Sequence, residues 1–256
     1  MLRAILLALG AAAALAPGAG PAPGVRSAFD AEEALRRSAA AYAALTAYAD
    51  TGTVVDDAGG FKDKYAFRTY FTRQPRNLLL DFSMIETEYT DGFKIKGTYG
   101  TVIWMENGLL QTYDIKTQEH ATYPEDGGRQ VEALNGATYG TKGVSAIVPS
   151  LIYTKAGMAS VIQATEEATA AGSESVDGRP CLKVMGIERW RYPSGQVTGV
   201  RPVTIWIDAE TYLVRRIFQD TPKSMTRGSI SRRTTTFRPH ANPSLGPASF
   251  HYAVAE

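Results

Sequence analysis

Residues 203–220, VTIWIDAETYLVRRIFQD, decide the fold of this chain. Successive side chains of a strand point to opposite faces, so Val203, Ile205 and Ile207 would share one face of a first strand. The polar residues 208–211 then form a corner, after which the apolar run restarts. The segment therefore predicts two antiparallel strands joined by a turn.

An aspartate ends the first of these strands, and two arginines follow on the second. Asp208 could act in catalysis beside Arg215 and Arg216, or it could be a turn residue whose carboxylate accepts nearby backbone N–H groups. Aspartate is common at corners for the second reason, which we favour. A pair of Asp208 with Glu210 would suit glycoside hydrolysis, but neighbouring turn carboxylates are far more often solvated.

The alternating pattern recurs upstream, from about residue 54 to residue 122. Asn107-Gly108 stands between two apolar runs, which is the strongest short-range signal for a β-hairpin. A second turn is predicted at Asp177-Gly178. Short strands with tight turns indicate an antiparallel meander rather than strand–helix–strand units. We therefore expect a mainly β fold with some helix, of the α+β class.

An amphipathic helix is expected near the N-terminus. Asp30 is a good N-cap, and Glu33 three residues later completes a capping-box pattern. We expect the helix to run to about Ala49 and to end before Gly52. Its apolar stripe, with steps of three and four residues, consists of Leu35, Ala39, Tyr42, Leu45 and Ala49.

The middle and the end of the chain break the strand rhythm. Residues 125–157 carry apolar residues at helical spacing and a proline, which indicates one or two short helices. Residues 228–239 are polar, threonine-rich and basic, which fits an exposed or edge strand. The proline- and glycine-rich residues 240–256 should wrap the surface, with a short strand around Phe250. No repeat or linker divides the chain, so one domain is expected.

The first 24 residues have the layout of a secretory signal peptide. A basic residue precedes the apolar run 4–16, which is too short to span a bilayer comfortably, and small residues follow. Cleavage is expected near Gly24, which would leave residues 25–256 as one exported domain. No cysteine follows the run, so no lipid anchor is expected at a new N-terminus. An uncleaved anchor is the alternative interpretation.

The composition excludes several classes of function. Lys and Arg total 27 against 26 Asp and Glu, a net charge of +1, which argues against a nucleic-acid partner. The one cysteine, Cys181, cannot form an intramolecular disulfide or a thiolate zinc site, and is expected in the core. A histidine metal site would need His120, His240 and His251 to converge. We expect no metal and no cofactor.

Catalytic motifs are absent from the sequence, which has no P-loop, GxGxxG, HExxH or GxSxG. We therefore expect no enzymatic activity, and a hydrolase of envelope lipids is the least favoured hypothesis. An apolar meander can fill its inner face with its own side chains, or curl around a helix and leave a cavity; the pattern leaves both open. Candidate residues for the wall or lid of such a cavity are Tyr65, Phe67, Phe71, Leu78, Leu80, Phe82, Trp104, Val144, Ile147, Leu151, Val203, Ile205 and Ile207.

The order of these pieces resembles a known superfamily. The helix ends in LTAYADTGTV, a strand leads into TRQPRNLLLDF, and ENGLLQTYDIKTQEH, IVPSLI, VDGRPCLKVMG and TIWIDAETYLVRRI follow in that order. This set resembles the periplasmic outer-membrane lipoprotein carrier superfamily, with LolA, LolB and RseB, over nearly all of the chain after residue 24. The resemblance implies a curved, incomplete antiparallel β-barrel with helices in its concave face as a lid, over a cavity that takes acyl chains.

The resemblance also implies a gating residue. In the carrier, an arginine just before a Pro-Asn segment helps to hold the lid closed through hydrogen bonds to helix carbonyls. Arg73 in TRQPRN matches that position, but Gln74 intervenes before the proline and Arg76 precedes Asn77. Arg73 and Arg76 are therefore both candidates for lid gating.

Two main functional hypotheses follow from these expectations. The first is a non-catalytic periplasmic binding or carrier protein for lipid or for lipoprotein acyl chains, which predicts an apolar cavity covered by helices. The alternative is an envelope-sensing protein of the RseB type, which contacts another membrane or periplasmic protein and predicts a large exposed apolar or charged patch.

Overall fold

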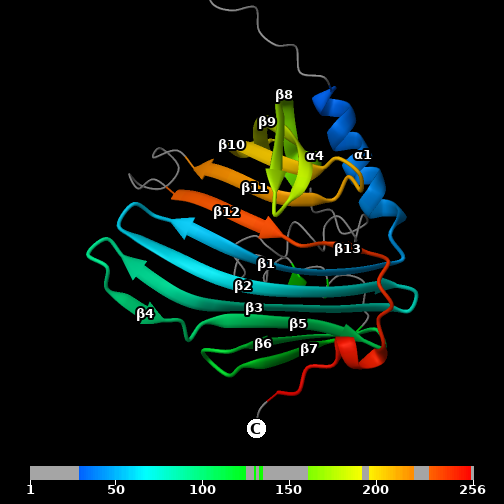
Figure 1. Ribbon diagram of the computed structural model, residues 1–256. Helices are drawn as coiled ribbons and strands as arrows, with labels where there is room; N and C mark the ends of the chain where they lie inside the picture. Colours follow the sequence, from blue (N-terminus) through cyan, green and yellow to red (C-terminus); the bar gives the residue numbers. More distant parts are fainter. Residues whose placement is uncertain are drawn as a thin grey trace, which may run out of the picture.

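One antiparallel β-sheet dominates the protein, as the computed structural model in Figure 1 shows. The structure describes residues 29–124, 130, 133–134, 161–191, 196–221 and 231–254. The predicted signal peptide and the candidate lid residues Val144, Ile147 and Leu151 lie outside the described residues. No helix in the described ranges is long and apolar enough to cross a membrane.

The described helices are α1 (Ala31–Ala44), α4 (Val161–Ala164) and the 3₁₀ helix η2 (Pro247–Phe250). The strands of the first half are β1 (Ala47–Asp57), β2 (Phe61–Arg73), β3 (Arg76–Tyr89), β4 (Lys94–Lys96), β5 (Gly100–Glu106), β6 (Leu109–Asp114) and β7 (His120–Tyr123). Those of the second half are β8 (Thr165–Val176), β9 (Arg179–Arg191), β10 (Val197–Asp208), β11 (Val214–Thr221), β12 (Ser231–Phe237) and β13 (His240–Ala241). The predicted mainly β composition is confirmed.

The strand order is β7-β6-β5-β3-β2-β1-β12-β11-β10-β9-β8, with β4 paired to β3 and β13 paired to β1. The chain therefore starts in the middle of the sheet and builds outward to β7 at one edge. It resumes at β8 on the opposite edge and returns to the middle, where β12 pairs antiparallel with β1. The described sheet is curved and does not close, because β7 and β8 are not paired with each other (Figure 1).

Helix α1 begins where the sequence predicts. The Asp30 carboxylate accepts a hydrogen bond from the Glu33 backbone N–H at 3.1 Å, which satisfies one free amide of the first turn. The predicted end at Ala49 is wrong, because α1 stops at Ala44 and Leu45 takes extended backbone angles (φ −66°, ψ 132°). Strand β1 starts soon afterwards, since the side chains there alternate between the two faces of the sheet.

Three predicted turns are confirmed. Asn107 and Gly108 join β5 to β6 with φ angles of 52° and 77°, and Asp177 and Gly178 join β8 to β9 with 49° and 76°. Positive φ at both central residues matches the twist of the flanking strands, which is why Asn, Asp and Gly are favoured there. The third turn joins β10 to β11 within the segment 203–220.

Two predictions for the C-terminal part are wrong. Strand β12 lies between β1 and β11 in the middle of the described sheet, not at an edge. Its polar sequence tolerates that place because Thr235 and Phe237 are buried while the backbone pairs on both sides. Around Phe250 the chain forms η2 rather than a strand, and the Phe250 ring is buried where η2 contacts β2, β3 and β5.

The sheet has two faces, and each carries a buried apolar cluster. We call the inner face the one whose side chains cluster with α1; Val54 and Ile217 belong to it. The outer face carries a smaller cluster around Leu79 and Val102, which Phe250 and other C-terminal residues cover.

Gly52 in β1 is closely packed on the inner face. A Cβ atom there would lie 2.1 Å from the Thr236 carbonyl oxygen and 2.3 Å from Cζ of Phe67. Glycine leaves room for the Phe67 ring, which also meets Phe237 edge-on at 5.5 Å between ring centroids. Gly52, which we expected to end a helix, therefore lies in the middle of the sheet and makes room for packed aromatic rings.

The two edges of the described sheet are irregular or short. The register of β8 with β9 shifts between Glu166 and Thr169 and again between Ala170 and Ser173. Most residues of β8 are exposed or half-buried. At the other edge, β7 has 4 residues.

Candidate functional site

The predicted cavity residues on β2, β3 and β10 come together on the inner face. Each is buried with α1 in one cluster, and none is more than 4% exposed. These strands lie in different halves of the sheet and meet through Val54, Phe237 and Ile217 of the strands between them. A continuous apolar surface thus crosses the described sheet. Its predicted members are Tyr65, Phe67, Phe71, Leu78, Leu80, Phe82, Val203, Ile205 and Ile207.

Trp104 does not belong to this surface, and its prediction as a cavity residue is wrong. Its neighbours Ile103 and Met105 join the inner-face cluster, whereas Trp104 lies in the outer-face cluster. Its ring stacks on His120 at 5.5 Å between centroids and contacts Tyr252. The sequence could not reveal this, because both faces of β5 are buried.

Helical residues supply the other side of the inner-face cluster. Leu35 and Tyr42 of α1, Ile162 of α4 and Leu134 are buried together with the strand residues. Helix α1 contacts α4, β8 and β9, so it lies beside the second half of the sheet (Figure 1). The apolar stripe that the sequence predicts on this helix is therefore the side that packs.

Arg73 binds the C-terminal end of α1. From the end of β2, its Nη2 donates to the Ala43 carbonyl at 3.1 Å and its Nε donates to the Leu45 carbonyl at 3.0 Å. The last carbonyls of a helix lack partners within it and carry partial negative charge, and α1 has no basic residue in its last turn. Of the two gating candidates, Arg73 makes these helix contacts, while Arg76 stands opposite it on the β2–β3 hairpin and is exposed.

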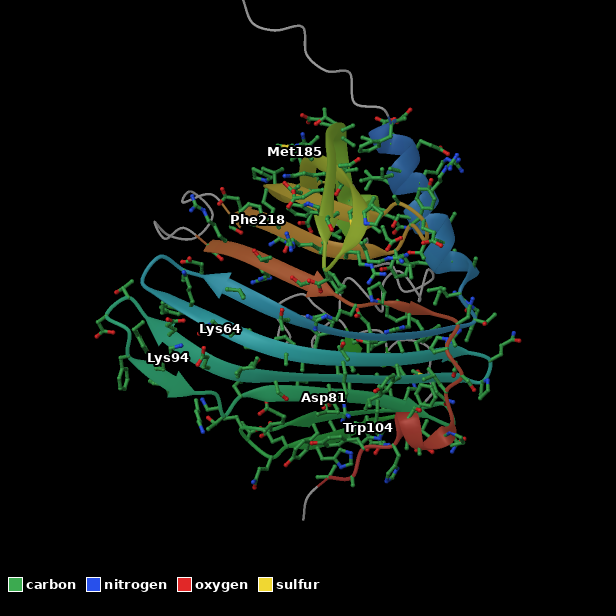
Figure 2. The ribbon with its side chains drawn as sticks, viewed as in Figure 1. Lys64, Asp81, Lys94, Trp104, Met185 and Phe218 are labelled. Atoms are coloured by element: carbon green, nitrogen blue, oxygen red, sulfur yellow. The ribbon has the colours of Figure 1, made fainter. Side chains whose placement is uncertain are left out.

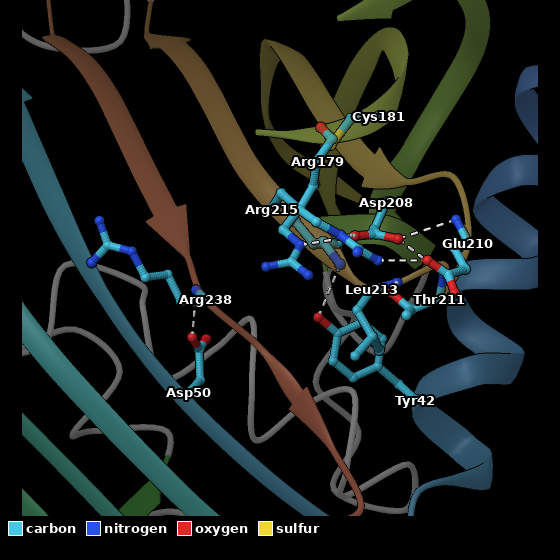
Figure 3. A network of polar contacts seen from close by, with 11 residues as sticks. Tyr42, Asp50, Arg179, Cys181, Asp208, Glu210, Thr211, Leu213, Arg215 and Arg238 are labelled. Carbon is cyan, nitrogen blue, oxygen red and sulfur yellow. Dashed lines mark hydrogen bonds and ion pairs between the residues drawn. The ribbon is translucent and has the colours of Figure 1, made fainter. Parts of the chain in front are cut away.

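A chain of buried polar groups links α1 to the sheet, and Figure 3 shows Tyr42 at one end of it and Asp50 with Arg238 at the other. The Val214 backbone N–H donates to the Tyr42 hydroxyl at 3.2 Å, and the Tyr42 hydroxyl is hydrogen-bonded to that of Tyr48. Tyr48 donates to the Asp50 carboxylate at 2.9 Å, and the Arg238 backbone N–H donates to it at 2.8 Å. Burial raises the pKa of Asp50 to about 7, although these donors act in the opposite direction.

Two buried hydroxyl groups near this chain have no hydrogen-bond partner among the described residues. They are Oγ of Ser38, on the buried side of α1, and Oγ1 of Thr69, which lies opposite Asp50 on β2. A buried hydroxyl without a partner is rare and costs about 1–3 kcal/mol. The contact between α1 and the inner face is therefore not fully satisfied.

Asp208 is a structural turn residue, as the sequence favours. Its Oδ1 accepts the backbone N–H groups of Glu210 and Thr211 at 3.1 and 3.0 Å, and its Oδ2 accepts Nε of Arg179 and Arg215 at 3.2 and 3.1 Å (Figure 3). Desolvation would raise the pKa of Asp208, but the Thr211 N–H and the Arg179 guanidinium together hold it at about 2. These contacts tie the corner of the β10–β11 hairpin to β9.

Polar side chains form a row across the inner face, which the sequence analysis missed. The Asp56 carboxylate of β1 accepts Nη2 of Arg233 at 3.1 Å and the Ser231 hydroxyl at 3.0 Å, both from the segment of β12. Asp63 of β2 stands opposite Asp56 and accepts the Thr87 hydroxyl of β3 at 2.7 Å. The row therefore spans four neighbouring strands here.

The row continues into the second half of the sheet. The Glu188 carboxylate of β9 accepts Nε of Arg201 at 2.6 Å and Nε2 of Gln219 at 2.8 Å. Gln219 stands opposite Arg233, which joins the two parts. The signal that could have revealed this row is a charged or amide residue two positions from an inner-face apolar residue, as Gln219 is from Ile217.

Beyond the polar row, one end of the sheet exposes large apolar side chains. Phe61 of β2 pairs with Tyr89 of β3, and the Tyr89 ring contacts the Phe93 ring at 6.0 Å. We call this group the apolar rim; its members are Phe61, Ile85, Tyr89, Phe93 and Ile95, each at least 38% exposed. Between these residues, Lys64 and Lys94, which Figure 2 labels, form ion pairs with Glu86 and Glu88.

No three His, Cys, Asp or Glu side chains of the described ranges are placed to hold a metal ion. His240 lies in β13, and Nδ1 of His251 is 3.9 Å from the Glu106 carboxylate. Cys181 is buried, and this burial raises the pKa of its thiol. The expected core position of Cys181 is confirmed.

Comparison with known proteins finds no matching family model and no matching curated protein. Similar solved structures include the Mycobacterium tuberculosis lipoprotein LppX, with 13% identity and a TM-score of 0.46 over 84% of this chain and 96% of that chain. The Pseudomonas aeruginosa MucA/MucB complex matches with 13% identity and 0.41, over 88% of this chain and 62% of that one. A LolA superfamily protein from Nitrosomonas europaea matches with 9% identity and 0.32, over 88% and 99%.

These structures include a member of the LolA superfamily, the superfamily that the order of the sequence pieces resembles. The TM-scores lie below 0.5, so the likeness concerns the course of the chain and says nothing about ligands or residue roles.

Proposed function

We propose that this protein is a non-catalytic binding protein for acyl chains of lipids or lipoproteins, held between the inner face of the sheet and helix α1. The observation that carries the proposal is the continuous apolar surface, to which both halves of an open sheet contribute beneath a helix. An alkyl chain can take the place of helix contacts on such a surface. Removing the chain from water contributes ~25 cal/mol per Å² before the costs of association.

In this proposal α1 is a lid in the concave face of the sheet, and the described structure is its closed state. The candidate wall residues that the structure describes are all buried, so a chain can enter only if part of the cover moves. The hydrogen bonds from Arg73 to Ala43 and Leu45 oppose that movement at one end of the helix. The role that the sequence resemblance implies for the gating arginine agrees with these contacts.

The hydroxyl groups of Ser38 and Thr69, which have no hydrogen-bond partner among the described residues, support a cover that can change its contacts. They belong to α1 and to the inner face respectively, and both are fully buried. A helix that served only to complete the core would be expected to satisfy or exclude such groups. An occupant with a polar atom, or water admitted on opening, would give them partners.

We place this activity in the periplasm, after removal of residues 1–24. The basic residue, the apolar run and the small residues at the start of the chain support export. An acyl chain that crosses an aqueous compartment needs an apolar interior around it, because its exposure to water is unfavourable.

Native mass spectrometry of the mature protein, purified gently from its own periplasm, tests this function. We expect near-stoichiometric acylated species to accompany the protein, and solvent extraction to identify them. A mass without ligand, together with no uptake of added fatty acid or phospholipid, would contradict the proposal.

A second candidate function is contact with another envelope protein, which the apolar rim favours. A group of exposed aromatic and aliphatic residues on one corner is typical of an interaction surface. A photo-crosslinking amino acid at Phe93 should then capture a discrete protein in cell envelopes. The same amino acid at the exposed Thr117 is the control, and identical products from both positions would reject this function.

A further inference from the structure

A pocket of about 390 Å³ opens between α1, α4 and the first residues of β8. Its apolar wall includes Leu35 and Ala39 of α1, Ile162 of α4 and Ala168 of β8. Leu35 and Ile162 belong to the inner-face cluster, and Ala39 and Ala168 pack against it. The pocket is therefore continuous with the apolar surface to which we assign acyl chains, and its volume lies within the usual range of ligand pockets.

Charged side chains surround the opening of this pocket. Glu32, Arg36 and Glu166 line the pocket, so its opening is charged and faces water, while the wall below is apolar. Arg36 is paired with Glu33 at 2.7 Å, and Glu166 with Arg189 at 2.9 Å. Partly exposed ion pairs of this kind contribute little to stability, so the charged side chains around the pocket opening can rearrange at low cost.

The pocket lies at an edge of the described sheet, where β8 pairs with β9. Among the described residues α1 makes no backbone hydrogen bond to β8, so a movement of α1 away from β8 leaves that pairing intact. The hydrogen bonds of Tyr42 and Arg73 hold the C-terminal end of α1, whereas the pocket lies along its N-terminal half. Between the two lies Arg37, whose Nη1 donates to the Tyr212 hydroxyl at 2.9 Å on the exposed side of the helix. A movement of the helix at the pocket therefore has to give up this exposed contact, while the C-terminal end stays bound.

We propose that this pocket is the entrance through which the alkyl chain of a single-chain amphiphile reaches the inner face. The polar head of the amphiphile stays at the charged opening of the pocket. The inference rests on the proposed function and adds the route and the kind of ligand. The apolar wall contacts the alkyl chain, and the exposed charged opening leaves the polar head in water.

Tryptophan substitutions in matched pairs test the entrance. Ala39→Trp and Ala168→Trp each place an indole ring in the pocket from opposite walls, while Ala40→Trp and Ala171→Trp place the same ring on exposed neighbouring positions. The probe is cis-parinaric acid, whose fluorescence on binding is followed by stopped flow. We expect the two pocket variants to take up the probe at least about tenfold more slowly than their controls, which corresponds to a higher barrier for entry.

Urea unfolding of each variant separates blocking from misfolding. Two pocket variants on different elements keep the test valid if one of them does not fold. Uptake by a folded Ala39→Trp or Ala168→Trp protein at the rate of its control would overturn the entrance and leave the proposed function intact. No uptake by the unaltered protein would overturn the proposed function, and the entrance with it.

Discussion

Two buried aspartates of this protein have opposite acid–base behaviour because their partners differ. Asp208 accepts hydrogen bonds from two guanidinium groups and two backbone amides, which stabilise its ionised form. Asp50 accepts a tyrosine hydroxyl and one amide of Arg238 in an apolar setting, where desolvation dominates. Burial alone therefore does not fix the charge of a carboxyl group; the number of ionised and amide donors does.

We expect the Asp50→Asn substitution to remove a pH dependence of stability. The folded-state pKa of about 7 lies above the ordinary value of 3.8, so the folded protein keeps a proton that the unfolded chain releases. Stability should therefore fall as pH rises from about 4 to about 7, by at most ~4 kcal/mol at ~1.36 kcal/mol per pKa unit. Asparagine stays neutral, so in urea unfolding the variant should compare more favourably with the unaltered protein at about pH 8 than at about pH 5.

The control for this experiment is Asp57→Asn on the same strand, where the carboxylate forms an exposed pair with Lys62 at 3.7 Å. That variant should show no such change between the two pH values. A difference between the Asp50→Asn variant and the unaltered protein that is equal at both pH values would contradict the buried neutral carboxyl group.

Replacing Asp208 by asparagine should lower the free energy of unfolding by about 3 kcal/mol at neutral pH, because Arg179 and Arg215 lose their anionic partner. Its folded-state pKa of about 2 lies below 3.8, so this contribution is present above about pH 4 and is lost as pH falls towards 2. Urea unfolding at about pH 7 and about pH 3 measures both. Asp220→Asn, in an exposed pair with Arg232 at 3.8 Å, should cost less than ~1 kcal/mol; equal losses would refute the prediction.

Among the structural elements, α1 depends most on contacts from outside itself. It is 14 residues long and lacks a basic residue in its last turn, so Arg73 from β2 supplies the donors for its final carbonyls. Short helices in water are marginal and gain most of their stability from packing. The attachment of this helix is therefore a property of β2 and β1 as much as of its own sequence.

The Arg73→Met substitution tests that attachment. Loss of two charged hydrogen bonds should destabilise the protein by about 2 kcal/mol and speed amide hydrogen exchange in the last turn of α1. Arg76→Met, at the exposed position opposite on the hairpin, should change neither by much. Equal exchange rates in the two variants would show that Arg73 does not hold the helix.

Local sequence signals predicted the elements well. The capping residues Asp30 and Glu33 gave the start of α1, and Asn107-Gly108 gave a hairpin, because the energies that decide these features lie within a few residues. The end of α1 was predicted wrongly, since the residues after Ala44 fit both periods. Pairing with β2 and β13 favours a strand over a helix in this segment, and partners that are distant in sequence do not appear in a local pattern.

At the scale of the whole molecule, the proposed function gives the inner and outer faces different roles, although both are buried. Leu80 and Leu79 are neighbours on β3, at most 2% exposed, and point to opposite faces. Alanine at either position should cost about 2–5 kcal/mol through lost packing. Only Leu80→Ala should change the equilibrium affinity for a fatty acid, measured by fluorescence titration, and an equal change in Leu79→Ala would place the ligand elsewhere.

The arrangement of the whole sheet was harder to derive from the sequence. Trp104 was assigned to the wrong face because both sides of β5 are apolar, and the outer cover comes from residues more than a hundred positions later, around Phe250. The central place of β12 was missed because its inward positions hold Arg233 and Thr235. A polar residue in the middle of a sheet is recognisable only when its partners, such as Asp56, are known.

The irregular edge β8 and the short edge β7 have a consequence for behaviour at high concentration. An open sheet with long, flat edges offers unpaired N–H and C=O groups on which a second chain could add strands and begin a fibril. Strand β8 has two register shifts and carries the charged Glu166 and Glu174, so a second chain cannot pair along it as a straight edge. Strand β7 is short, with 4 residues available for pairing. The described sheet can therefore stay open without inviting aggregation at its two edges.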